Sequence, residues 1–246
     1  MIKVHSADAV TRITLNAAPR HNALDQGAIT RLTEVLDTLP PATRVVVLTG
    51  TGKSFCAGAA LGDVAENDWT ENPLTMLCDR LEAVPQPTIC ALNGGVYGGG
   101  VELAIACDFR IGVEDMRAFV PPAELGIHYP PRGLARSERL LGLQATRRMF
   151  LCAEKFDAAE LVALGFLDQV VPADDLMDRV SALAQRLADL APLAVQGMKQ
   201  SLYEIGRGEV DTAAASTRIA ACFSSDDHAE GLAARADRRS PRFFGR

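Results

Sequence analysis

The feature that most constrains this fold is a run of four apolar residues, Val45-Val46-Val47-Leu48, inside the segment 44–49. The run is short, rich in β-branched side chains and without alternating polar residues. Such a segment suits a strand that is buried on both faces, as in a parallel sheet covered by helices. We therefore expect a largely parallel sheet at the centre of the chain.

Strand and helix patterns alternate over the first half of the chain. Further strands are predicted at 10–15, 88–92 and 108–113, with a short extended piece at 118–122. The helical segments between them are predicted at 28–39, before Val84 and at 101–107. Strands that alternate with helices imply βαβ crossovers, so the predicted fold class is α/β.

The last third of the chain has a different pattern. From Gln144 onward the strand signals nearly vanish, and helical spacing dominates the segments 174–191, 192–205, 211–223 and 227–238. A helical region after an α/β core needs a surface to cover, which in a chain of this size is often a neighbouring subunit. We predict a core over residues 1–190 and a C-terminal helical region over 191–246.

Composition limits the partners and the compartment. The net charge of −6 disfavours non-specific binding to nucleic acid or to membranes, and no apolar run is long enough to span a bilayer. The N-terminus lacks the apolar stretch of a signal peptide, so we expect a cytoplasmic protein. The six cysteines are scattered without CxxC spacing, so we expect buried reduced thiols and no metal site.

Two glycine-rich segments resemble nucleotide-binding motifs without satisfying them. Gly50-Thr51-Gly52-Lys53-Ser54 matches the end of a P-loop, but Val47 stands where the first glycine belongs. The glycines between Gly94 and Gly100 lack the third glycine of a dinucleotide fingerprint, where Leu103 stands. Neither an ATPase nor a Rossmann enzyme is expected.

Two turns of small residues are the candidates for chemistry. The turn 54–60 holds no acid–base side chain, so it is either purely structural or acts through its backbone. In 93–102, three glycines precede a helix, whose unpaired N–H groups stabilise developing negative charge. Glu102 follows Gly99 by three residues, on the same side of the helix. It is either a base for proton transfer next to a carbonyl or a carboxylate that complements the helix dipole.

Four blocks in order resemble the crotonase (enoyl-CoA hydratase/isomerase) superfamily over essentially the whole chain. They are Ile13-Thr14-Leu15-Asn16 with Pro19–Leu24, Val45–Gly50 with Phe55–Ala59, Asn93–Asp108 with its GGG-x-E-L core at Gly98–Leu103, and Phe223 to Phe243. The resemblance implies a crotonase-like spiral of ββα turns followed by a C-terminal helical trimerisation region. It also implies a homotrimer or a dimer of trimers.

The resemblance implies roles for particular residues. The N–H groups of Ala59 and Gly99 would form an oxyanion hole for a thioester carbonyl, with Glu102 as the base. Coenzyme A would enter as part of an acyl-CoA substrate, with no separate cofactor. The residues implied near its CoA portion are Arg20, His21, Ala23, Leu24, Ala57, Gly58, Ala60, Leu61 and Arg238.

One wall of the implied site departs from the family pattern. The second glutamate of the hydratases aligns with Pro122 or Ala123, and Glu124 misses the place by one or two residues. Glu124 is either a substitute acid or a solvated carboxylate. Tyr129 matches a pocket tyrosine of the methylmalonyl-CoA decarboxylase branch, or it packs in the core. We therefore expect an enoyl-CoA hydratase/isomerase, with a methylmalonyl-CoA-type decarboxylase and a non-catalytic crotonase-fold binding protein as alternatives.

Overall fold

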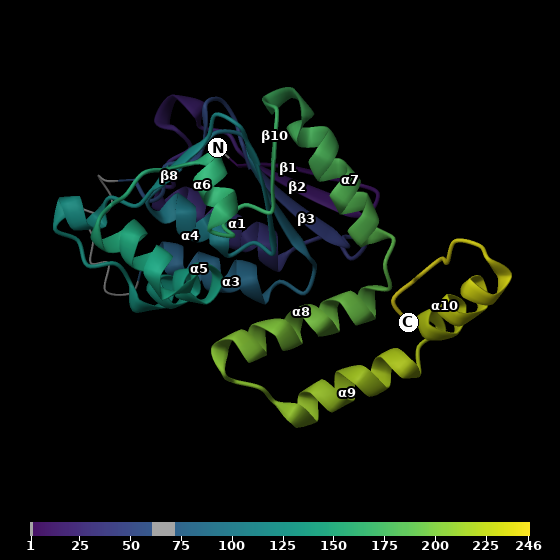
Figure 1. Ribbon diagram of the computed structural model, residues 1–246. Helices are drawn as coiled ribbons and strands as arrows, with labels where there is room; N and C mark the ends of the chain where they lie inside the picture. Colours follow the sequence, from purple (N-terminus) through teal and green to yellow (C-terminus); the bar gives the residue numbers. More distant parts are fainter. Residues whose placement is uncertain (1, 61–71) are drawn as a thin grey trace.

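A computed structural model describes residues 2–60 and 72–246, and a six-stranded sheet lies at its centre (Figure 1). In spatial order its strands are β1 (Ile2–Ala7), β2 (Val10–Leu15), β3 (Val45–Gly50), β5 (Thr88–Leu92), β7 (Phe109–Val113) and β10 (Gln169–Val171). β1 pairs with β2 in antiparallel fashion, and every other neighbouring pair is parallel. The predicted parallel sheet is confirmed.

The run at Val45–Leu48 lies where its composition predicts. β3 is flanked by β2 and β5, and its four apolar residues are almost entirely inaccessible to solvent. Helix α7 (Leu176–Ala188) packs against β3, β5 and β7. Burial on both faces therefore explains why this strand lacks an alternating polar pattern.

A second sheet, which the sequence patterns do not predict, lies beside the first. Its strands, in order, are β4 (Ser54–Cys56), β6 (Gly95–Tyr97), β8 (Arg117–Phe119) and β9 (Phe156–Asp157). Each has two or three residues, too few for a periodic signal. β4, β6 and β8 directly follow β3, β5 and β7 in the chain, so each unit adds one strand to each sheet. These ββα units form the crotonase-like spiral that the resemblance implied.

The helices follow the strands in a regular order. Around the sheets they are α1 (Gln26–Asp37), α3 (Pro73–Ala83), α4 (Gly99–Ile105), α5 (Pro131–Leu151) and α6 (Ala158–Ala163). Short 3-10 turns are η1 (Ala18–Arg20), η2 (Pro122–Leu125) and η3 (Ala173–Asp175). α1 begins after Asp25, whose carboxylate accepts a hydrogen bond from the Ala28 N–H at 2.8 Å. α4 begins at Gly99, two residues before its predicted start.

Although strand signals nearly vanish from Gln144 onward, two short strands, β9 and β10, form in this part of the chain. β10 completes the six-stranded sheet by pairing in parallel with β7, where Val170 lies opposite Gly112. Its three residues are partly buried, and one of them, Gln169, is polar. A strand this short is specified by its neighbour in the sheet, and local sequence pattern alone does not reveal it.

The C-terminal helices extend away from the sheets (Figure 1). They are α8 (Pro192–Arg207), α9 (Thr212–Phe223) and α10 (Asp226–Asp237), and α8 packs along α9. Charged contacts attach α8 to the body, among them Lys199 Nζ to Asp108 Oδ2 at 2.8 Å. The division at residue 190 stays a prediction. Of the helices formed by residues 2–60 and 72–246, none has the length and apolar character to cross a membrane.

Four of the six cysteines, Cys56, Cys78, Cys90 and Cys107, are buried free thiols. Cys222 is partly buried, and Cys152 is exposed. The expectation of buried thiols is therefore wrong for Cys152, which directly follows the exposed Leu151 at the end of the helix α5.

Candidate active site

The two small-residue turns lie against each other because β4 and β6 are parallel neighbours. Ser54 pairs with Gly95 and Cys56 with Val96, so the residues that follow each strand emerge at the same edge. Gly58 has a positive φ of 83°, and a Cβ atom there would lie 2.5 Å from the Gly99 nitrogen. The close approach of the two backbones therefore requires glycine at position 58.

The N–H groups of Ala59 and Gly99 lack backbone acceptors in the described part of the chain. A Cβ atom built on Gly99 would lie 3.6 Å from the Ala59 nitrogen, which shows how close the two residues are. Both are only partly buried. Two neighbouring donors without acceptors, reachable from outside, are what an oxyanion-binding site requires.

The loop of residues 20–24 runs beside the first turn. The Leu24 N–H donates to the Gly58 oxygen at 2.8 Å, and the Ala60 N–H donates to the Leu24 oxygen at 2.9 Å. The Ala57 N–H donates to the His21 oxygen at 2.9 Å. The structure thus brings together most of the residues implied near CoA, and the side chains of Arg20 and His21 are exposed there.

Asn22 holds this loop in place and was not singled out from the sequence. Its side-chain amide donates to the backbone oxygens of Thr51, Ser54 and Phe55 at 2.8–3.1 Å, and its Oδ1 accepts from the Ala17 N–H. Asn22 is buried and has a positive φ of 56°. An asparagine that tolerates this backbone conformation and bonds several carbonyls is a local signal that sequence reasoning can use.

One of the implied CoA residues, Arg238, is not brought to this place. Leu61 lies outside the described residues. Arg238 follows α10 as an exposed cap residue, and Figure 1 shows α10 far from α4. Within one chain, Arg238 is therefore remote from the two turns.

Glu102 lies in α4, one turn after Gly99, and its side chain is 1% exposed. Its Oε1 accepts a hydrogen bond from Arg136 at 2.5 Å, and its Oε2 accepts one from the Tyr129 hydroxyl at 2.8 Å. Gly133 also lies close, since a Cβ atom there would be 2.8 Å from Oε2. The carboxylate is thus enclosed by the start of α5 and by the segment before it.

Burial raises the pKa of Glu102, while the positive charge of Arg136 and the hydrogen bond from Tyr129 act in the opposite direction. Burial, together with the negative charge of Glu102, also holds the pKa of Tyr129 well above its usual value. Tyr129 is therefore a neutral hydrogen-bond donor at physiological pH. A carboxylate with a raised pKa beside such a donor suits proton transfer.

Tyr129 and Glu124 lie in the wall of the site that departs from the family pattern. Tyr129 is partly buried, contacts Phe150 edge-on with ring centroids 4.8 Å apart, and bonds Glu102. Glu124 lies in the turn η2 with an exposed side chain, as expected for a solvated carboxylate. Of these two residues, Tyr129 is therefore the one that contacts Glu102.

A group of charged residues behind Glu102 was missed from the sequence. Arg136 also forms ion pairs with Asp79 at 2.5 Å and Glu82 at 3.1 Å, both on α3. Arg132, Arg136 and Arg139 recur at intervals of four and three residues, which places them on one face of α5. This basic stripe is a signal that sequence reasoning can detect, but its acidic partners on α3 lie more than fifty residues away.

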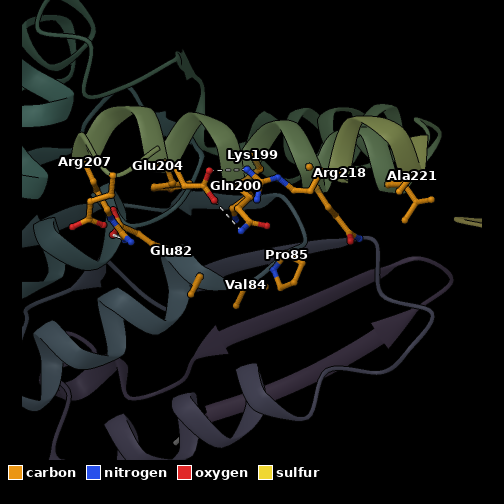
Figure 2. A pocket seen from close by; sticks show the side chains of 15 residues that line it. Glu82, Val84, Pro85, Lys199, Gln200, Glu204, Arg207, Arg218 and Ala221 are labelled. Atoms are coloured by element: carbon orange, nitrogen blue, oxygen red, sulfur yellow. Dashed lines mark hydrogen bonds and ion pairs between the residues drawn. The ribbon is translucent and has the colours of Figure 1, made fainter. Parts of the chain in front are cut away.

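A cavity of about 570 Å³ lies elsewhere, between α8, α9 and the end of α3 (Figure 2). Its lining includes Val84, Pro85, Lys199 and Arg218, and neither Ala59 nor Gly99 contributes to it. The cavity is therefore a space beneath the C-terminal helices and is separate from the two turns.

A spiral of ββα units, with two small-residue turns meeting beside a buried glutamate, defines the crotonase class of acyl-CoA proteins. A crystal structure of an enoyl-CoA hydratase/carnithine racemase from Magnetospirillum magneticum superposes with a TM-score of 0.93 and 29% identity, covering 100% of this chain and 96% of that one.

Residues 5–246 match the sequence profile of the family described as enoyl-CoA hydratase/isomerase. A probable enoyl-CoA hydratase of Mycobacterium leprae is 34% identical over the full length of both chains. A 2,3-dehydroadipyl-CoA hydratase of Escherichia coli is 32% identical, covering 96% of each chain. The chain belongs to the enoyl-CoA hydratase/isomerase family, and it is an enzyme that acts on acyl-CoA.

Proposed function

We propose that this enzyme holds the thioester carbonyl oxygen of an enoyl-CoA between the N–H groups of Ala59 and Gly99. The support is that both groups lack backbone acceptors among the described residues and lie side by side. They stabilise the enolate that forms when a proton leaves the carbon next to the carbonyl. One such donor typically lowers the barrier by about 3–4 kcal/mol.

The same site proposal assigns proton transfer to Glu102, with Tyr129 as its hydrogen-bonding partner. A double-bond shift needs one group that removes a proton and returns it to another carbon. Hydration by the two-carboxylate route needs a second carboxylate, and Glu124 is exposed. The single observation that carries the proposal is the hydrogen bond of 2.8 Å between Tyr129 and Glu102 beside the Gly99 turn. This bond supports Glu102 as the group that transfers the proton, and the exposed position of Glu124 favours isomerisation of an enoyl-CoA over hydration.

The experiment compares wild type with Glu102→Gln on a 3-enoyl-CoA, a trans-2-enoyl-CoA and methylmalonyl-CoA. We expect isomerisation to be the fastest reaction and the substitution to lower kcat by about 10²–10⁴-fold. The matched control is Glu124→Gln, which changes an exposed carboxylate in the same way and leaves kcat unchanged. Isomerisation that survives Glu102→Gln undiminished removes Glu102 from the mechanism.

Decarboxylation of a malonyl-type CoA ester is the second candidate, because it needs enolate stabilisation and a proton donor but no base. The Tyr129 hydroxyl is the observation that favours it. Release of carbon dioxide from methylmalonyl-CoA that falls with Tyr129→Phe supports this reaction. No release from wild type excludes it.

The proposal extends to the CoA portion of the substrate and to assembly. The backbone of 20–24 and 57–60 lies against the nucleotide, and Arg20 or His21 meets a phosphate. Arg238 reaches the CoA bound to a neighbouring subunit, since α10 is remote from the turns of its own chain. Coenzyme A enters only as part of the substrate, and the protein is a homotrimer or a dimer of trimers. The cytoplasmic location stays a prediction.

A further inference from the structure

Arg136 lies at the centre of a buried cluster of charges. Its side chain is 2% exposed, and its guanidinium group lies among three carboxylates. Nη1 lies 2.5 Å from Glu102, Nη2 lies 2.5 Å from Asp79, and Nε lies 3.1 Å from Glu82. The rigid guanidinium thus fixes three acidic groups relative to one another.

The three carboxylates differ in how many cations they have. Asp79 also pairs with Arg132 at 2.6 Å. Glu82 also pairs with Arg139. It pairs with Arg207 of α8 at 2.7 Å, and Figure 2 shows these two side chains next to each other. Among the described residues, Glu102 has Arg136 as its one ion-pair partner. Loss of Arg136 therefore leaves Asp79 and Glu82 paired but leaves Glu102 without a cation.

The other groups around Glu102 cannot replace that positive charge. From α3 it faces the hydroxyl of Thr75, the thiol of Cys78 and the carboxylate of Asp79, and from the segment before α5 the hydroxyl of Tyr129. These groups are neutral or negative. A carboxylate that is almost fully buried favours its protonated form unless an opposite charge lies nearby.

We propose that Arg136 is a positioning residue that keeps Glu102 ionised and oriented toward the Gly99 turn. The inference rests on the proposed role of Glu102 as the base. Arg136 acts through Glu102 and does not touch the substrate. A purely structural cluster would instead tie α3 to α5 without any effect on the ionisation of Glu102.

The test compares wild type, Arg136→Gln and Arg136→Lys by the pH dependence of kcat and by titration of the Glu102 carboxyl carbon. The second measurement uses ¹³C NMR on protein labelled at glutamate side-chain carboxyls, with Glu102→Gln assigning the signal. In Arg136→Gln we expect both the acid limb of kcat and the carboxyl titration to move upward by about 1–3 pH units. KM stays within about twofold of wild type.

Arg132→Gln is the matched control, since it removes an arginine one turn earlier on the same helix that contacts Asp79 and not Glu102. It leaves both titrations where they are in wild type. Arg136→Lys keeps the positive charge but loses the planar guanidinium group. The Glu102 carboxyl in this variant should therefore titrate between its positions in wild type and in Arg136→Gln. If Arg136→Gln does not fold, the lysine variant carries the test.

The two readouts separate the positioning role from the proposed function. An unchanged carboxyl titration in a folded Arg136 variant overturns the role of Arg136, whatever the activity. If the carboxyl titration shifts but the pH dependence of kcat does not, Arg136 does keep Glu102 ionised. The same outcome contradicts the proposed function, because Glu102 is then not the base in the reaction.

Discussion

At the scale of single residues, the site depends on close backbone contact and on one enclosed carboxylate. Gly58 and Gly99 meet at a distance that leaves no room for a Cβ atom on Gly58. Glu102 lies one turn along α4 from the resulting pair of N–H groups. The donors are therefore fixed by backbone geometry and the acid–base group by side-chain packing, so the two can be perturbed separately.

Gly58→Ala tests the backbone part. The new Cβ atom would lie 2.5 Å from the Gly99 nitrogen, so the two turns must separate and the donors must move. We expect kcat to fall by about 10²–10³-fold, comparable to the loss of one oxyanion-hole donor. Gly165→Ala is the control, because Gly165 also has a positive φ but nothing lies within 4 Å of its Cβ position. Equal loss of activity in both variants would argue against the contact.

The raised pKa of Glu102 predicts how stability depends on pH. A carboxyl group whose pKa is higher in the folded state stabilises the fold below its unfolded pKa, and this contribution is lost as pH rises through the folded pKa. Glu102→Gln removes that loss. Its free energy of unfolding relative to wild type should therefore increase with rising pH, by about 1.4 kcal/mol for each pH unit of pKa elevation.

Urea denaturation of wild type and Glu102→Gln between pH 4.5 and pH 8 measures this difference. If the stability of Glu102→Gln relative to wild type instead decreases as pH rises, the fold favours the ionised form of the Glu102 side chain over the protonated form. Arg136 would then outweigh burial.

At the scale of elements, the structure explains which predictions from the sequence were successful. Strands such as β2 and β5 were predicted with their observed bounds, because five or six residues carry a clear pattern. Of the strands of the second sheet, β8 alone overlaps a prediction, the short extended piece at 118–122, since two or three residues are assigned by their neighbours rather than by their own pattern. The helix α5 was also missed, and Gly142 interrupts it with φ 76° and ψ 161°.

Gly142 provides a test of this interruption. Its backbone conformation is one that essentially only glycine adopts, so Gly142→Ala should lower the free energy of unfolding by about 1–3 kcal/mol. Gly27→Ala in α1 is the opposite case, because Gly27 is exposed and helical, and alanine should stabilise the protein by about 0.4–1 kcal/mol. Chemical denaturation checks both. A neutral effect at position 142 would show that α5 tolerates a straight helix there.

At the scale of the whole molecule, the C-terminal helices carry apolar side chains that one chain does not cover. Met198, Leu202 and Ile205 recur on one face of α8, and Ile219 and Phe223 lie one turn apart on α9; all are more than half exposed. Exposed apolar side chains grouped in this way commonly mark a protein interface. A neighbouring copy of the chain is the occupant that the proposed trimer provides.

The combined substitution of Leu202→Asp and Ile219→Asp tests this assembly. Charged side chains in an apolar interface remain without partners, so we expect the trimer to dissociate to monomers. Light scattering coupled to size-exclusion chromatography measures the mass. Val162→Asp on α6, another exposed apolar position, is the control and leaves the mass unchanged. A trimeric mass for the double variant would place the interface elsewhere.

The amino-acid sequence was enough to predict the buried strand at 45–48, the two small-residue turns, the spacing of Gly99 and Glu102 and the family. These are local patterns, in which the residues that matter lie within a few positions of one another. The folded structure was needed to show that the turns meet through a second sheet and that Arg136 joins Glu102 to Asp79 and Glu82. The physical reason is that ion pairs and short parallel strands depend on partners distant in the chain, which local pattern does not specify.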